Sequence, residues 1–183
     1  MAADPAPREA WQPAGRSPGA AQHLLGIYLN DHLAGATGGS ELARRLASSA
    51  RQPHARSALQ QLAADIAQDR AALLNIMSAL EIPVRSYKVY AAWIGEKAGR
   101  LKLNGRLLSR SPLSGLVEIE MLGLGIAGKA AAWRTLRLAA DRDARLDARK
   151  LDELIVRAGA QADLLEEFRV RAVQPVIGGP AAS

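Results

Sequence analysis

The chain contains no cysteine, and this absence excludes several kinds of site. Disulfides, thiolate zinc sites and a cysteine nucleophile are all ruled out. Histidine is also scarce, with three in 183 residues, so the candidate metal ligands are few. Aromatic residues amount to only 4% of the chain, whereas apolar residues make up 49% and are mostly leucine, alanine and isoleucine. This composition favours helices and is sufficient to fill the core of one domain.

Long apolar runs are lacking as well. The most apolar stretch, Leu113 to Trp133, is interrupted by Glu118, Glu120 and Lys129, so no membrane span is predicted. The first 20 residues hold four prolines and no apolar run. A secretory signal peptide is therefore not expected, and the cytoplasm is the expected location.

Apolar residues recur at spacings of three and four in four long segments, which predicts an all-α fold. No segment has the pattern of a strand. The predicted helices cover residues 22–50, 54–80, 112–140 and 147–173. We expect them to form a single helical-bundle domain over residues 22–173, flanked by a disordered N-terminal arm (1–21) and a flexible C-terminal tail (174–183).

The connection between the second and third helices, residues 83–112, is unusually long. It contains a predicted shorter helix from Val84 to about Arg100, in which apolar residues repeat as a docking stripe: Val84, Tyr87, Ala91, Ile94 and Ala98. A helix of about 17 residues spans roughly 25 Å at 1.5 Å per residue. This length suits a crossover along the bundle, which would make the second and third helices parallel.

The two hairpins, the crossover and the sequence YLNDHLAGATGGSELARRLA (Tyr28 to Ala47) resemble the ferritin-like superfamily, and more narrowly an uncharacterised bacterial family within it. The resemblance covers most of residues 22–173 and implies a four-helix bundle with an additional helix in the crossover. Ferritin-like metal enzymes carry Glu-x-x-His motifs on their helices. None of His23, His32 and His54 has a glutamate three residues before it. The resemblance therefore implies the fold without its usual metal ligands, and no cofactor is expected.

Four polar residues on or beside the apolar stripes are candidates for an altered metal site: Asp31, His32, Asp69 and Glu120. Asp69 lies within the apolar stripe of its helix, and a buried carboxylate is costly unless it is paired. If the second and third helices are parallel, counting from their shared end places Lys129 near Asp69. An ion pair with Lys129 or a hydrogen bond to His32 would satisfy Asp69 without metal. There are two alternatives for Asp69: it belongs to a metal site with oxygen ligands, or its side chain is exposed to solvent.

Six glycines lie within two of the predicted helices, where each costs roughly 0.5 to 1 kcal/mol relative to alanine. Small residues allow close approach of another backbone. We therefore expect the two glycine surfaces to face one another or to receive a neighbour. They comprise Gly35, Gly38 and Gly39 in the first helix, and Gly123, Gly125 and Gly128 in the third.

The net charge of +6 is concentrated between Pro83 and Pro112, where seven cations face the single anion Glu96. Three of the seven aromatic residues lie in the same segment. A basic surface with aromatics can bind an anionic partner such as a nucleic acid, a lipid or an acidic protein. Alternatively, the aromatics dock on the bundle and the charges are merely solvated. The candidate interaction residues are Arg85, Lys88, Lys97, Arg100, Lys102, Arg106 and Arg110.

No catalytic residue is predicted, because no histidine is paired with a nucleophile by a recognisable spacing. The function expected from the sequence is that of a non-catalytic helical bundle that acts by binding or by self-association, with the basic crossover as its interaction surface. The alternative is a ferritin-like metal-binding protein or oxidoreductase with an altered carboxylate site.

Overall fold

The computed structural model describes residues 18–85 and 112–178. These residues form four helices, α1 (Pro18–Ser49), α2 (Pro53–Ala79), α4 (Pro112–Ala140) and α5 (Ala148–Ile177), and no strand occurs among them. The predicted all-α architecture is confirmed. The additional helix predicted from Val84 to Arg100 lies outside the described residues from position 86 onward. So do all the candidate interaction residues except Arg85, which is exposed.

The helices begin at residues that favour a first turn. Proline is the first residue of α1, α2 and α4, where its fixed φ suits the helix and its missing N–H would have no helical partner. Asp147 precedes α5, and its carboxylate accepts a hydrogen bond from the Lys150 N–H at 3.0 Å. At the other end of α5, Gly178 has φ 71°, the left-handed conformation in which glycine commonly ends a helix.

Two helix ends differ from the sequence-based expectation of a bundle over residues 22–173. α1 begins at Pro18, since proline is a favoured first-turn residue and not part of the preceding arm. α5 continues past Pro175 to Ile177. A proline this close to the end of a helix removes one backbone donor without terminating the last turn.

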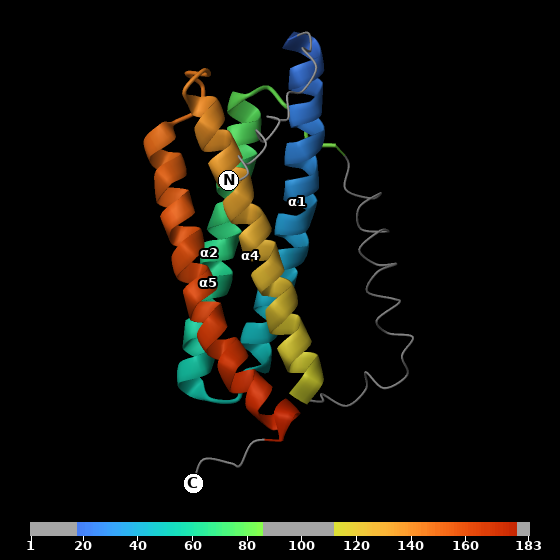
Figure 1. Cartoon of the computed structure of the whole chain (residues 1–183), viewed down its shortest axis with the longest axis vertical. Coiled ribbons are helices and arrows are strands. Elements are labelled where there is room, and N and C mark those ends of the chain that lie inside the picture. The colour runs from blue at the N-terminus through green and yellow to red at the C-terminus, as the bar shows by residue number, and fades with distance from the viewer. Residues whose placement is uncertain (1–17, 86–111, 179–183) are drawn as a thin grey trace, which may run out of the picture.

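The four helices form two antiparallel hairpins (Figure 1). α1 packs against α2, α4 packs against α5, and the hairpins meet mainly through α1 and α4. α2 and α4 run in the same direction, as predicted, so the end of α2 and the start of α4 lie at opposite ends of the bundle (Figure 1). Residues 86–111 therefore connect the two ends.

The hydrophobic core consists of two clusters separated by a polar layer. One cluster includes Leu29, Leu33, Leu73, Met77, Trp133, Leu136, Leu151 and Leu154. The other includes Leu46, Leu62, Ile66, Leu122, Ile126, Leu165 and Phe168. Asp69 of α2 lies between them, because Ile66 belongs to the second cluster and Leu73 to the first. Within residues 18–85 and 112–178, no helix combines the length and apolarity needed to cross a membrane.

Asn30 of α1 holds the chain where it leaves α2. Its side chain is buried, donates hydrogen bonds to the carbonyls of Gly26 and Pro83 at 2.7 and 3.1 Å, and accepts one from the Arg85 N–H at 2.8 Å. Both ends of the amide are thus used, and two of the three bonds attach residues 83–85 to α1. The path of the chain toward residue 86 is fixed on the α1 side of the bundle.

Replacing Asn30 by alanine is expected to lower the free energy of unfolding by about 1 to 3 kcal/mol, because it leaves buried backbone groups without partners. Urea denaturation followed by circular dichroism measures the change. Asn75→Ala, at an exposed position of α2, is the matched control and should change stability by less than about 0.5 kcal/mol. Equal effects of the two substitutions would contradict the role assigned to Asn30.

Candidate functional site: a buried ion-pair network at the centre of the bundle

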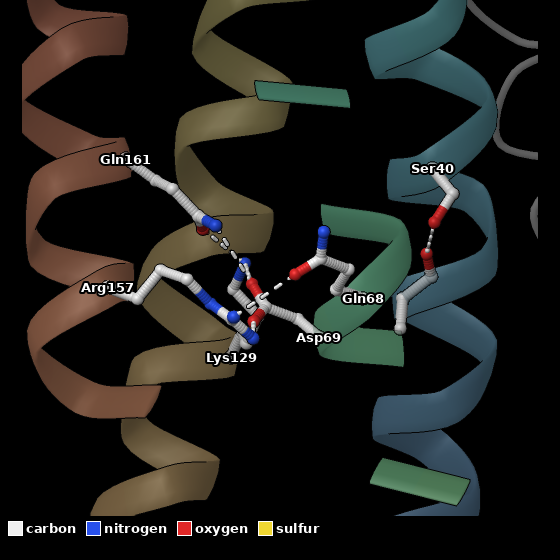
Figure 2. Close-up of polar contacts among 7 residues, drawn as sticks. Ser40, Gln68, Asp69, Lys129, Arg157 and Gln161 are labelled. Carbon is white, nitrogen blue, oxygen red and sulfur yellow. Dashed lines mark hydrogen bonds and ion pairs between the residues drawn. The ribbon is translucent and has the colours of Figure 1, made fainter. Parts of the chain in front are cut away.

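The polar layer is built by three helices around one carboxylate (Figure 2). Asp69 of α2 is 1% exposed. Lys129 points toward it from α4, while Arg157 and Gln161 reach it from α5, where they lie one helical turn apart. Long side chains are needed here because the α2 and α5 backbones approach each other less closely than those within the hairpins.

Both carboxylate oxygens of Asp69 are held by protein donors. Lys129 Nζ donates to Asp69 Oδ2 at 2.5 Å, and Gln161 Nε2 donates to the same oxygen at 3.0 Å. Arg157 Nη2 forms an ion pair with Oδ1. Lys129 Nζ also donates to Gln161 Oε1 at 2.5 Å, so Gln161 links the ammonium and the carboxylate. One anion and two cations give the network a formal charge of +1.

Burial places an electrostatic cost on Lys129. Desolvation lowers the pKa of its ammonium group below the usual 10.5, and the charge of Arg157 acts in the same direction. The charge and hydrogen bond of Asp69 oppose this shift without cancelling it. The side chain is 12% exposed, so solvent screens these interactions only weakly.

The lowered pKa of Lys129 predicts a pH dependence of stability. Between the folded-state pKa and 10.5, the unfolded chain holds the Lys129 proton while the folded chain releases it. The free energy of unfolding therefore rises with pH across that window. We expect the stability of the wild type, measured relative to Lys129→Met by urea denaturation at several alkaline pH values, to rise as the pH approaches 10.5. A relative stability that falls over this range would contradict the direction.

The structure brings three of the four candidate metal ligands to one cavity. Asp31, His32 and Asp69 all line it, whereas Glu120 is exposed on α4, nine residues before Lys129 in the sequence. Asp69 and Glu120 therefore do not converge. Among the described residues, no group of three or more histidine, aspartate and glutamate side chains is placed to hold a metal ion. The Lys129 ammonium is the group that meets Asp69 instead.

His32 packs on an aromatic ring, and no hydrogen bond joins its side chain to Asp69. Its ring meets that of Tyr28 edge to face, with centroids 4.5 Å apart. Partial burial lowers the pKa of His32, an effect that the neighbouring Asp31 charge partly opposes. The neutral imidazole is therefore favoured near neutral pH. Of the two predicted partners of Asp69, the structure shows the ion pair with Lys129 and not the hydrogen bond to His32. His23 and His54 are exposed, as expected for residues near helix starts.

The cavity lies between α1, α2 and α4 and has a volume of about 220 Å³. Four glycines line the cavity, two from α1 (Gly35 and Gly39) and two from α4 (Gly125 and Gly128). The two glycine surfaces thus border one space, as the sequence predicted. Gly123 does not line the cavity. It lies toward α5 instead, where a β-carbon would be 3.7 Å from Leu165.

Arg157 was the network member that sequence reasoning missed. It lies three residues after Leu154 and four before Gln161, which places it beside the apolar stripe of α5. A cation beside an apolar stripe indicates that a buried anion lies nearby. The spacing of residues along α5 does not identify that anion as Asp69.

Comparison with protein-family models, with curated proteins and with solved structures finds no match for this chain.

Proposed function

We propose that this chain is a non-catalytic helical-bundle protein that acts by binding a negatively charged partner through the basic segment between α2 and α4. The observation that carries the proposal is the saturation of Asp69. Its two oxygens are engaged by Lys129, Arg157 and Gln161, so the centre of the bundle is occupied by protein groups. Such a network stabilises the bundle. We therefore assign the binding function to the surface of the protein.

The charge distribution supports an anionic partner. The segment from Pro83 to Pro112 carries the whole net charge of +6, and Arg85 at its start is exposed. Clustered cations attract anionic partners over several ångströms and make association sensitive to salt.

Binding to a labelled polyanion, heparin, tests this proposal. We expect binding that weakens steeply as salt rises from about 50 to 200 mM, and a loss of at least about tenfold in affinity when Arg100, Lys102 and Arg106 are changed to glutamate. Changing Arg51, Arg142 and Arg149 to glutamate is the matched control, because these exposed cations outside the segment alter the net charge equally. No binding at low salt, or equal losses in the two variants, would contradict the proposal.

We also propose that the bundle has ferritin-like connectivity. Its support is the pair of antiparallel hairpins and the parallel course of α2 and α4, which requires one lengthwise connection (Figure 1). The alternative function, a ferritin-like metal protein with an altered site, has less support because a lysine ammonium lies against the only carboxylate buried among the described residues.

A further inference from the structure

The outer face of α4 is apolar although nothing among the described residues covers it. Leu113, Met121, Leu124 and Leu138 are between 50% and 73% exposed. Their spacings are sums of three and four residues, so they form one row along the helix. Glu120 is the one charge that flanks this row near its centre. A helix that is apolar on both its inner and outer faces is normally covered on both.

The cavity continues this row toward α1. Gly128 follows Leu124 by one helical turn and lines the cavity. Trp133, which is 1% exposed, lines it too, and its indole N–H has no hydrogen-bond partner among residues 18–85 and 112–178. Protein interiors contain few voids larger than a water molecule, and buried donors are rarely left without an acceptor. The apolar lining, the empty volume and the unpaired donor all indicate that another group fills this space.

We propose that the occupant is the chain's own connection, residues 86–111, seated in the groove between α1 and α4 with its apolar stripe inward. Asn30 attaches Pro83 and Arg85 to α1, so the chain enters at one end of this groove. Gly35 and Gly39 follow Asn30 along α1, in the direction of the end of the bundle where Pro112 begins α4 (Figure 1). The groove therefore lies on the direct route between the two fixed ends.

The sequence of the connection has the matching chemistry. Its predicted helix carries the stripe Tyr87, Ala91, Ile94 and Ala98, and none of its cations occupies a stripe position: Lys88 and Lys97 lie between them, and Arg85 and Arg100 lie beyond them. Small residues on α1 and α4 leave room for large ones from a third element, and the aromatics Tyr87, Tyr90 and Trp93 are available. Docking with this face inward directs the cations to solvent. The inference does not depend on the proposed function, because docking and polyanion binding are measured separately.

Glycine substitutions provide the test. An added β-carbon at Gly35, Gly39, Gly125 or Gly128 meets no described atom within 4 Å, so a larger side chain can start at each position without a clash at its β-carbon. We expect such a side chain to fill the cavity in place of the connection. The blocking variant is Gly35→Leu combined with Gly128→Leu. Gly159→Leu on α5 is the matched control, since Gly159 is exposed, also has no neighbour within 4 Å and does not line the cavity.

Limited trypsin digestion of the full chain is the readout, because the connection contains six lysine and arginine residues after position 85. We expect wild-type cleavage within 86–111 to be slow, and cleavage to be at least about tenfold faster in the blocking variant, since proteolysis follows the population of the open form. The control should be cut at the wild-type rate. Circular dichroism confirms that the helices remain in all three proteins.

Three results would overturn the inference. One is wild-type cleavage as fast as that of a synthetic 86–111 peptide, and another is an unchanged rate in the blocking variant. The third is a wild-type dimer in analytical ultracentrifugation that the blocking variant dissociates without any change in cleavage, which would assign the groove to a second copy of the chain.

Discussion

Asp69→Ala is expected to lower the free energy of unfolding by about 3 to 5 kcal/mol, since removing one partner of a buried ion pair leaves the other charge uncompensated. Lys129 is the charge left behind, with a side chain only 12% exposed, while Arg157 can turn toward solvent because it is 35% exposed. Domains of this size are commonly stable by only about 5 to 15 kcal/mol, so the loss should shift the urea midpoint strongly.

Asp65→Ala is the matched control for this prediction. Asp65 lies one turn before Asp69 on α2 and is half-buried, and Gln61 donates a hydrogen bond to it at 2.8 Å. Its charge acts on Lys129 without a direct bond. Its removal should change stability by less than about 0.5 kcal/mol. Equal losses for Asp65→Ala and Asp69→Ala would show that the network has no special role.

The double variant Asp69→Leu with Lys129→Met separates an unpaired charge from a loss of packing. Replacing a buried pair by apolar residues of similar size is often neutral or stabilising by about 1 to 4 kcal/mol. We expect the double variant to recover part of the stability lost in Asp69→Ala, because the Lys129 charge is gone while the buried Gln161 amide has lost both of its partners. A double variant as unstable as the single one would contradict the assignment of the loss to the Lys129 charge.

Trp133→Ala should be the most damaging change in the apolar core, with a loss of about 3 to 5 kcal/mol. Trp133 is the largest fully buried side chain among the described residues, and it packs with Leu29, Leu136 and Met77 in one cluster. Truncation to alanine removes these contacts and enlarges a cavity that is already about 220 Å³.

Trp133→Phe provides the contrast. It keeps an aromatic ring and removes an indole N–H that has no partner among the described residues, so the cost should remain below about 1.5 kcal/mol. Thermal or urea unfolding compares the three proteins. A loss from Trp133→Phe as large as that from Trp133→Ala would show that the indole N–H makes a bond essential to the fold.

Much of this arrangement could be predicted from spacing. Proline positions and three-and-four periodicity gave the four helices, and the length of the connection gave the parallel course of α2 and α4. The parallel course in turn placed Lys129 at the level of Asp69, and the ion pair confirms that inference.

Other features depend on geometry that spacing does not contain. Arg157 reaches Asp69 from α5, a helix that follows α4 through the turn at residues 141–147. The position of a long, flexible side chain within such a layer cannot be counted from the sequence. Glu120 and Asp69 both interrupt apolar stripes, but Glu120 lies nine positions before Lys129 on α4 and is exposed.

The polar layer also suggests why an ionic group is retained in an otherwise apolar core. It separates two clusters of leucine, isoleucine and alanine that would tolerate sliding of one helix along another. Pairing of Asp69 with Lys129 and Gln161 is satisfied in only one register of three helices. If the layer specifies this register, the double variant should unfold in a broader transition than the wild type.

We expect that protein groups, and not a metal ion, satisfy Asp69 in solution as they do in the structure. Elemental analysis of the purified chain, repeated after anaerobic incubation with excess iron(II) and desalting, measures this. Iron and manganese should remain far below one equivalent per chain, in the wild type and in Asp69→Ala alike. Near-stoichiometric metal in the wild type that is lost in Asp69→Ala would contradict it.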